Sequence, residues 1–105
     1  MPDLEQRKIL FVAKFSRMRN ECREYCAQEG IGFEAMIRPT YALERVSQDP
    51  NGFVIIDCCN SSRLRESANN KDIPYRGEEC LFGFTVKDMA RCVNALMRTG
   101  EPQHA

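Results

Sequence analysis

Three residue types that take part in phosphate chemistry lie close together in the middle of the chain. Asp57 directly follows the apolar run 53–56, and Cys59 and Arg65 come next with five residues between them. In a loop of this C-x5-R spacing, a cysteine thiolate attacks phosphorus and the arginine binds the phosphate oxygens. Such a loop follows a buried strand, which the run 53–56 predicts. The spacing therefore raises the hypothesis of a cysteine-dependent phosphatase.

Other residues of the same loop argue against that chemistry. No glycine lies between Cys59 and Arg65 to let backbone amides turn toward an anion, and Asp57 and Glu66 would repel one. Loose motifs of this kind also have a high false-positive rate. We therefore expect an ordinary thiol at Cys59, in a solvated turn that begins a short helix, and keep the phosphatase as an alternative.

Several arginines suggest a second kind of site. Arg63 and Arg65 would lie at the carboxyl edge of a parallel sheet, where open α/β sheets bind ligands. They are candidate anion contacts for a phosphate or a cyclic dinucleotide. Acidic residues are equally close in the sequence, so we favour a balanced charged surface. The further arginines are Arg17, Arg19 and Arg76, and the acids are Glu66, Asp72, Glu78 and Glu79.

Apolar runs predict the strands that position these side chains. The run 8–13 is typical of a strand that is covered on both faces. The segments 32–37 and 53–56 predict two further strands. Short connections between strands and helices predict a parallel sheet with right-handed crossovers.

Helices are expected at about 16–29, 40–48 and 86–98, with at most a short one near 61–67. Ser16 and Thr40 are suitable N-caps for the first two, and Gly30 ends the first. The last begins with a capping box and ends near Gly100 and Pro102. The capping box is Thr85-Val86-Lys87-Asp88, and the apolar stripe of the first helix is Met18, Cys22, Tyr25 and Cys26.

The path of residues 58–80 is the least determined part of the sequence. The apolar pieces 73–75 and 80–82 are separated by four residues, too few for the crossover that parallel neighbours need. Either the two pieces form an antiparallel hairpin, or only the second is a strand. A thioredoxin-like fold, with a cis-proline at Pro74 before a hairpin and the last helix, is an alternative, but no C-x-x-C follows the first strand.

Composition limits the classes of protein. With 105 residues the chain predicts a single domain, with an ordered core at about 7–98. Fifteen basic and fifteen acidic residues cancel, so we expect no nucleic-acid or membrane-surface partner. No apolar run approaches the roughly 20 residues of a spanning helix. The N-terminus does not resemble a signal or transit peptide, and we expect a cytoplasmic protein.

Six cysteines invite a disulfide or metal-site hypothesis. Cys22, Cys26 and Cys92 fall on apolar helix faces, where a reduced cysteine packs as a small hydrophobe. Cys22 and Cys26 are four residues apart, but no second pair of possible ligands has the spacing of a zinc site, and the only histidine is His104. We expect structural thiols, no metal and no cofactor.

The order and spacing of these elements resemble the CheY-like response-regulator receiver family over residues 8–57 and about 81–98. The resemblance implies a three-layer, doubly wound α/β domain of flavodoxin-like type with a mostly parallel sheet. It places Asp57 at the position of the phospho-acceptor. The matching motifs are Phe15-Ser16-x-Met18-Arg19, Asp57 itself, Asp72-Ile73-Pro74 and Phe84-Thr85.

The sequence departs from the receiver pattern at the residues that would perform phosphoryl transfer. Ala13 and Lys14 replace the acidic pair that holds magnesium in the family, and Phe82 replaces its lysine. The hydroxyl expected after the fourth strand is missing, since Arg76 and Gly77 follow Tyr75. We expect Lys14 to lie near Asp57 as an ion pair. The resemblance implies a pseudo-receiver whose Asp57 is vestigial and which has no catalytic residue.

The second departure is length. The segment from the third helix through the fourth strand to the fourth helix is too short for the complete family pattern. A missing helix would uncover part of the sheet, and such a face is usually an interface. The candidate interface residues are Tyr75, Leu81, Phe82 and Phe84.

The predicted function is regulatory protein–protein interaction in signal transduction, of the two-component type, without catalysis. The expected partners are proteins of a signalling pathway, with a homodimer as a further possibility. The alternative is a small-ligand sensor for phosphate or a cyclic dinucleotide, or the phosphatase that uses Cys59 and Arg65.

Overall fold

Four parallel strands form one sheet in the order β2-β1-β3-β4, with helices on both faces. The computed structural model describes residues 6–78 and 83–98. A wider π-helical turn, Asn94–Arg98, continues the last helix. The elements are β1 (Lys8–Val12), α1 (Ser16–Glu29), β2 (Phe33–Met36), α2 (Pro39–Gln48), β3 (Phe53–Asp57), α3 (Ser62–Asn70), β4 (Tyr75–Gly77) and α4 (Val86–Val93).

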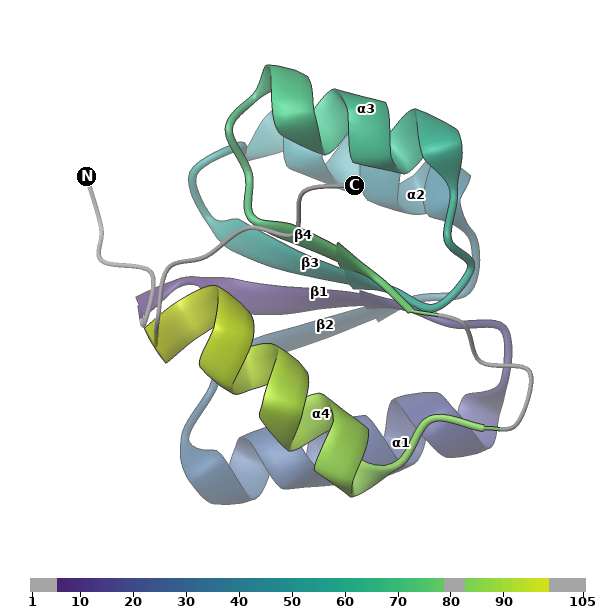
Figure 1. The fold of residues 1–105 in the computed structure, drawn as a ribbon, viewed down its shortest axis with the longest axis vertical. Coiled ribbons are helices and arrows are strands. Elements are labelled where there is room, and N and C mark those ends of the chain that lie inside the picture. Colours follow the sequence, from purple (N-terminus) through teal and green to yellow (C-terminus); the bar gives the residue numbers. More distant parts are fainter. Residues whose placement is uncertain (1–5, 79–82, 99–105) are drawn as a thin grey trace.

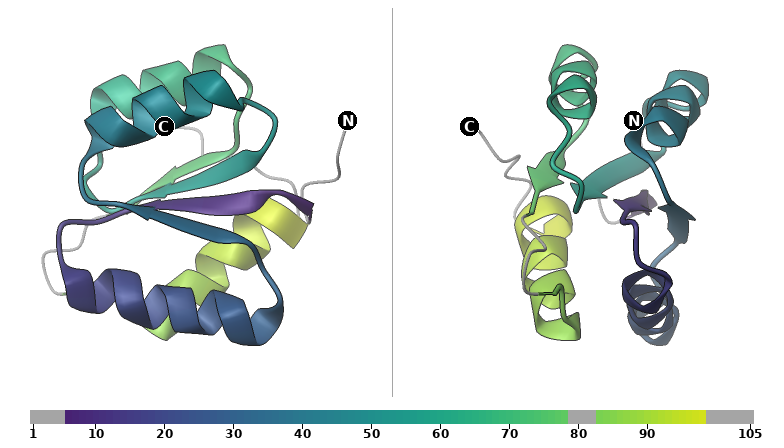
Figure 2. Two further views of the ribbon diagram at one scale, coloured as in Figure 1. Left: turned by 180° about the vertical axis from the view of Figure 1, so that it is seen from behind. Right: turned by 90° about the vertical axis from the view of Figure 1, so that its right-hand side faces the viewer.

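The two faces of the sheet carry separate hydrophobic clusters. Helices α2 and α3 cover one face, and α1 and α4 cover the other (Figures 1 and 2). Because side chains alternate along a strand, β1 and β3 each contribute to both clusters. This double burial explains why both strands are continuously apolar. Ile9, Phe11, Val54 and Ile56 face α1 and α4, whereas Leu10, Val12, Phe53 and Ile55 face α2 and α3.

The predicted doubly wound α/β fold is confirmed, and all the strand pairs are parallel. The expected uncovered sheet face is wrong for the described residues, because two helices lie on each face. The shortening falls after β4. No helix lies between β4 and α4 within the described residues, and α4 packs beside α1.

The structure differs from the prediction for residues 58–80 in two respects. The first apolar piece provides the strand β4, which pairs in parallel with β3, so the alternative in which only the second piece is a strand is wrong. The crossover is α3, which extends through residues 67–70 and is longer than the short helix expected near 61–67. Leu64 and Ala68 of α3 pack on Tyr75, so a few buried side chains hold a mostly polar helix in place. The piece 80–82 lies outside the described residues.

Two of the four candidate interface residues are buried. Tyr75 is 1% exposed and Phe84 is 5% exposed, so the predicted exposure of both is wrong. Tyr75 lies in the cluster beneath α2 and α3. The ring of Phe84 lies 5.5 Å from the ring of Phe11, beneath α1 and α4. Leu81 and Phe82 lie outside the described residues.

The helix ends follow the predictions only in part. Gly30 adopts the left-handed conformation (φ 70°) at the end of α1, and Thr85 and Asp88 form the predicted capping box of α4. Ser16 and Thr40 are not caps, because α1 and α2 begin after Phe15 and Arg38 without a side-chain cap. Proline at the first position of α2 explains that start, since its fixed φ suits a first helical residue.

The cysteines of the described segments are free thiols, and Cys22, Cys26 and Cys92 are buried as predicted. Burial raises the pKa of Cys26 to about 11 and that of Cys92 to about 12, so both thiols are protonated at neutral pH. Within residues 6–78 and 83–98, no group of three or more histidine, cysteine or acidic side chains could hold a metal ion. No described helix has the length and apolar character needed to span a membrane.

Candidate functional site

Asp57 ends β3 at the carboxyl edge of the sheet, and its side chain is fully buried. The chain turns back over the carboxylate, so that two backbone amides of the next loop point at it. Oδ1 accepts a hydrogen bond from the Cys59 amide (2.9 Å), and Oδ2 accepts one from the Ser61 amide (2.8 Å). A carboxylate that binds nearby backbone amides in this way stabilises a turn. Asp57 thereby positions the start of α3.

Tyr75 supplies a third hydrogen bond to this carboxylate. Its residue position pairs with Ile55 on β3, and its hydroxyl donates to Oδ2 of Asp57 at 2.7 Å. Burial raises the pKa of Tyr75, and the adjacent Asp57 raises it further. The hydroxyl therefore stays protonated and acts as a donor. Together these contacts engage both oxygens of Asp57.

Arg65 is part of the support for the same loop. Its guanidinium donates from Nη2 to Oδ1 of Asn60 at 2.6 Å and lies 5.4 Å from the centre of the Tyr75 ring. Gly77 makes room for this pair, because a Cβ at that position would collide with Asn60 Oδ1 and Arg65 Nη2. Arg65 therefore stabilises the turn through Asn60 and through the ring of Tyr75.

The two residues predicted to replace the acidic pair follow the adjacent strand. Val12 pairs with Asp57, and Ala13 and Lys14 come next. Ala13 is buried and Lys14 is exposed. The predicted ion pair between Lys14 and Asp57 is wrong: within the described residues, Asp57 takes its donors from its own loop and from Tyr75.

These residues do not fit the magnesium ion of a phosphorylatable receiver. Mg²⁺ requires several oxygen ligands in near-octahedral geometry. Asp57 brings one carboxylate to this edge, and both of its oxygens already accept hydrogen bonds. Ala13 and Lys14 offer no side-chain oxygen.

The C-x5-R segment does not form an open cradle for an external anion. Its amides at Cys59 and Ser61 bind the carboxylate of Asp57, and the Leu64 amide donates to Oγ of Ser61. The protein's own carboxylate thus uses amides that a bound phosphate would need. Burial and the nearby Asp57 raise the pKa of Cys59, which disfavours the nucleophilic thiolate.

The favoured interpretation of the arginines is a balanced charged surface, and the alternative arginine cluster is dispersed among the described residues. Arg63 is exposed on α3 beside Leu43 of α2, away from the Asn60 contact of Arg65. Arg17 pairs with Glu21, and Arg19 donates to the carbonyl oxygens of Ala13 and Lys14. Each of these last two arginines therefore has a local structural partner.

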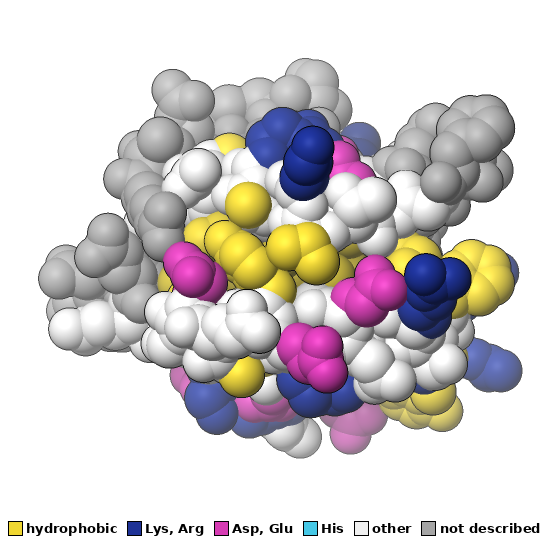
Figure 3. Space-filling model, turned by 90° about the horizontal axis from the view of Figure 1, so that it is seen from below, with side chains coloured by type: hydrophobic (Ala, Val, Ile, Leu, Met, Phe, Trp, Pro, Cys, Tyr) yellow, Lys and Arg dark blue, Asp and Glu magenta, His cyan; other side chains and the backbone are white. Residues whose placement is uncertain are grey.

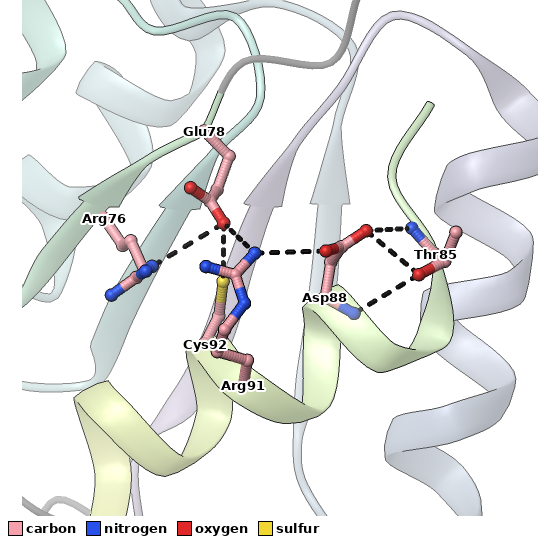
Figure 4. A network of polar contacts seen from close by, with 6 residues as sticks. All are labelled: Arg76, Glu78, Thr85, Asp88, Arg91 and Cys92. Carbon is pink, nitrogen blue, oxygen red and sulfur yellow. Dashed lines mark hydrogen bonds and ion pairs between the residues drawn. The ribbon is translucent and has the colours of Figure 1, made fainter. Parts of the chain in front are cut away.

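A polar network that the sequence did not reveal joins β4 to α4 (Figure 4). Oε1 of Glu78 accepts hydrogen bonds from Arg91 Nη2 at 2.9 Å and from Cys92 Sγ at 3.3 Å. The same oxygen lies 3.6 Å from Nε of Arg76. Arg91 also donates to Asp88 of the capping box at 3.1 Å. Glu78 and Arg91 are too far apart in sequence for a spacing rule to connect them, so no local signal could have identified this network.

Comparisons with known proteins give a match at the level of structure. No family model matches the chain, and no curated protein matches its sequence. The fold is similar to the solution structure of a response regulator protein from Burkholderia multivorans, with a TM-score of 0.54 and 12% identity. The similarity covers 94% of this chain and 98% of that one.

This similarity confirms the receiver-like fold predicted from the sequence. It extends over nearly all of both chains, so it includes α4 as well as the β-α-β half that carries Asp57. At 12% identity, it is a likeness of fold.

Proposed function

We propose that this protein is a non-catalytic pseudo-receiver that acts as a regulatory protein-binding module in signal transduction. The observation that carries the proposal is the engagement of Asp57. Its buried carboxylate accepts hydrogen bonds from two loop amides and from Tyr75. The fold similarity to a response regulator supports the signalling role.

Asp57 lacks what an aspartate needs in order to accept a phosphoryl group. The nucleophilic oxygen must reach phosphorus in line with the leaving group, and metal and cationic groups must neutralise the transferring oxygens. Attack by Asp57 would require loss of hydrogen bonds that hold the β3–α3 turn. The adjacent Ala13 and Lys14 supply no magnesium ligands. A regulatory role would then depend on binding and not on phosphorylation.

The phosphatase and the small-ligand sensor are less well supported alternatives. Both need donors free to bind an anion at the carboxyl edge. The amides of Cys59 and Ser61 bind Asp57, and Arg65 binds Asn60. The raised pKa of Cys59 also leaves little thiolate at neutral pH.

The first prediction concerns phosphorylation. Purified protein incubated with magnesium and either acetyl phosphate or phosphoramidate should keep its unmodified intact mass, because Asp57 is engaged and magnesium lacks ligands. A receiver known to be phosphorylated under the same conditions provides the positive control. Addition of one phosphoryl group per chain, lost in Asp57→Asn, would refute the proposal.

A parallel assay tests the enzymatic alternative. The protein should not hydrolyse para-nitrophenyl phosphate above the level of its Cys59→Ser variant. Turnover that is abolished by both Cys59→Ser and Arg65→Lys would replace the binding-module proposal with the phosphatase.

A further inference from the structure

The described residues include four large hydrophobic side chains that are substantially exposed. They are Phe15 (62%), Ile37 (49%), Tyr41 (53%) and Val86 (43%). Single exposed hydrophobics are ordinary on a protein surface, but a group of them marks an interaction site. Three of the four come from two neighbouring connections, so their positions are not scattered.

The β1–α1 and β2–α2 connections lie side by side at the carboxyl edge. β1 and β2 are adjacent parallel strands, and the amide of Ala13 donates to the carbonyl oxygen of Met36 at 3.0 Å. Phe15 precedes α1, Ile37 follows β2, and Tyr41 is in the first turn of α2. α1 and α2 leave this edge toward opposite faces of the sheet (Figures 1 and 2), so the first residues of both helices lie at the same edge. We call Lys14, Phe15, Ile37, Arg38 and Tyr41 the edge patch.

Charge is also unevenly distributed here. Residues 13–20 and 36–43 contain four cationic side chains and no acidic one, although the whole chain has a net charge of zero. Arg17 pairs with Glu21, and Arg19 binds backbone carbonyls. Lys14 and Arg38 are exposed, and in the described segments neither pairs with an acid. The edge patch therefore combines hydrophobic surface with two uncompensated positive charges.

The groove between α1 and α4 has acidic side chains beside its hydrophobic ones. Figure 3 views the face made by α1 and α4, with acidic side chains beside a hydrophobic seam. Tyr25 and Val86 line this seam together with Glu21 and Glu24. At the right-hand side of the same view, where the carboxyl edge lies, hydrophobic side chains adjoin Lys and Arg side chains. The edge patch is therefore distinct in charge from the α1–α4 seam.

We propose that the edge patch binds an acidic segment of a partner protein that also carries aliphatic or aromatic side chains. Carboxylates of that segment would pair with Lys14 and Arg38, and its apolar side chains would pack on Phe15, Ile37 and Tyr41. Two unpaired cations are fewer than nucleic-acid or anionic-lipid binding usually requires. Nucleic-acid binding usually neutralises more phosphates, and binding to anionic lipids usually uses about four to eight basic residues. This inference rests on the binding-module part of the proposed function and adds the surface and the chemistry of its partner.

The test begins with a random-peptide display library selected against the purified protein. We expect the recovered peptides to be enriched in Asp and Glu combined with Leu, Ile or Phe. The dissociation constant of one recovered peptide is then measured by fluorescence anisotropy. Lys14→Glu with Arg38→Glu should weaken binding at least about tenfold, as should Phe15→Ser with Ile37→Ser. Added salt should weaken binding because it screens the charges.

Matched variants control for nonspecific effects. Arg63→Glu with Lys87→Glu reverses two exposed charges on α3 and α4, and Val86→Ser removes an exposed hydrophobic side chain outside the edge patch. We expect both variants to bind the peptide as the unmodified protein does. Serine is a favoured N-cap, so Phe15→Ser should leave α1 intact, and circular dichroism checks the fold of every variant.

The opposing outcomes are equally specific. The inference is wrong if no acidic peptides are recovered, if the edge variants bind normally, or if the control variants lose binding to the same extent. It is also wrong if phosphatidylserine vesicles or duplex DNA bind the edge patch more tightly than the peptide. The phosphorylation assay separates the two proposals. Phosphorylated Asp57 overturns the pseudo-receiver, whereas normal binding by edge variants of an unphosphorylated protein overturns only the edge patch.

Discussion

At the scale of single residues, the contacts of Asp57 give the carboxylate at the end of β3 a structural role. The same residue type at the same strand end is a nucleophile in the family that the sequence resembles. Here its oxygens accept hydrogen bonds from Cys59, Ser61 and Tyr75. Sequence reasoning placed Asp57 at the end of a buried strand, and the structure has it at the end of β3. Sequence reasoning could not identify Tyr75 as a partner, because that contact depends on the pairing of β4 with β3.

The Tyr75 hydroxyl gives a prediction about stability. Tyr75→Phe should lower the free energy of unfolding by about 1.5–3 kcal/mol, the range for a hydrogen bond to a charged group. Urea denaturation measures the change, and Tyr41→Phe provides the matched control because Tyr41 is exposed. A loss that is equal in the two variants would contradict the structural role of the Tyr75 hydroxyl.

The same residue predicts a dependence on alkaline pH. The folded protein raises the pKa of Tyr75, so the unfolded chain releases this proton first, near about pH 10. Stability from this group is therefore complete below that pH and is lost as pH rises toward the folded-state pKa. Above about pH 10, the unmodified protein should lose more stability per pH unit than Tyr75→Phe.

Gly77 provides a second test at the residue scale. Gly77→Ala should displace the Asn60–Arg65 pair and cost about 1 kcal/mol, a typical net hydrogen-bond contribution. In an Asn60→Gly background the hydrogen bond from Arg65 to Asn60 is already absent. Glycine suits position 60, because its φ is 51°. Gly77→Ala should therefore cost less there. Equal costs in the two backgrounds would rule out the proposed contact.

At the scale of elements, sequence patterns predicted the strands and helices with strong periodicity. β1 and β3 were recognisable because both of their faces are buried, and α4 because of its capping box and apolar stripe. α3 was expected only as a short helix near 61–67, and the pairing of β4 was not predicted, because each element depends on tertiary contacts. Only Leu64 and Ala68 are buried on α3, and only Tyr75 is fully buried on β4. Two or three buried side chains give too weak a periodic signal.

The capping box of α4 gives a prediction at this scale. Oδ2 of Asp88 accepts from the Thr85 amide at 2.8 Å, and Oγ1 of Thr85 accepts from the Asp88 amide at 3.3 Å. Asp88→Ala should lower the free energy of unfolding by about 0.5–2 kcal/mol, the usual range for loss of a helix cap. Thermal denaturation at neutral pH measures this loss, with Lys87→Ala as a neighbouring control.

Acid titration tests the charge of the same cap. Hydrogen bonds from Thr85 lower the pKa of Asp88 below its usual value. Its contribution is therefore present above the unfolded-state pKa, near about 4, and is lost as pH falls through the folded-state pKa. The stability difference between the protein and Asp88→Asn should shrink on acidification. A difference that is constant from neutral pH to below about pH 3 would contradict this origin.

At the scale of the whole molecule, the two hydrophobic clusters lie back to back on one sheet. Phe11 lies at the centre of one of them and contacts the rings of Phe33 and Phe84, with centroids 5.9 and 5.5 Å away. A chain of this size has roughly 5–15 kcal/mol of total stability. Loss of a single buried aromatic side chain can therefore remove a large part of the free energy of unfolding.

The last prediction compares a buried phenylalanine, Phe11, with an exposed one, Phe15. Phe11→Ala should lower the free energy of unfolding by about 3–5 kcal/mol because it leaves a cavity under α1 and α4. Phe15→Ala should change it by less than about 0.5 kcal/mol because Phe15 is exposed. Urea denaturation of the two variants measures both changes. Similar losses would mean that Phe15 is part of the core and does not belong to a free edge patch.

The packing of α4 beside α1 has a consequence for biosynthesis. The ribosome makes β1 first, yet Phe11 of β1 acquires part of its cover only from Met89 and Leu96 near the other end of the sequence. A nascent chain can pair β1, β2 and β3 and still expose the hydrophobic surface that α4 will cover. We expect chains terminated after β4 to be recognised by chaperones and proteases. Messenger RNAs with a premature stop codon between β4 and α4 would then yield little stable protein.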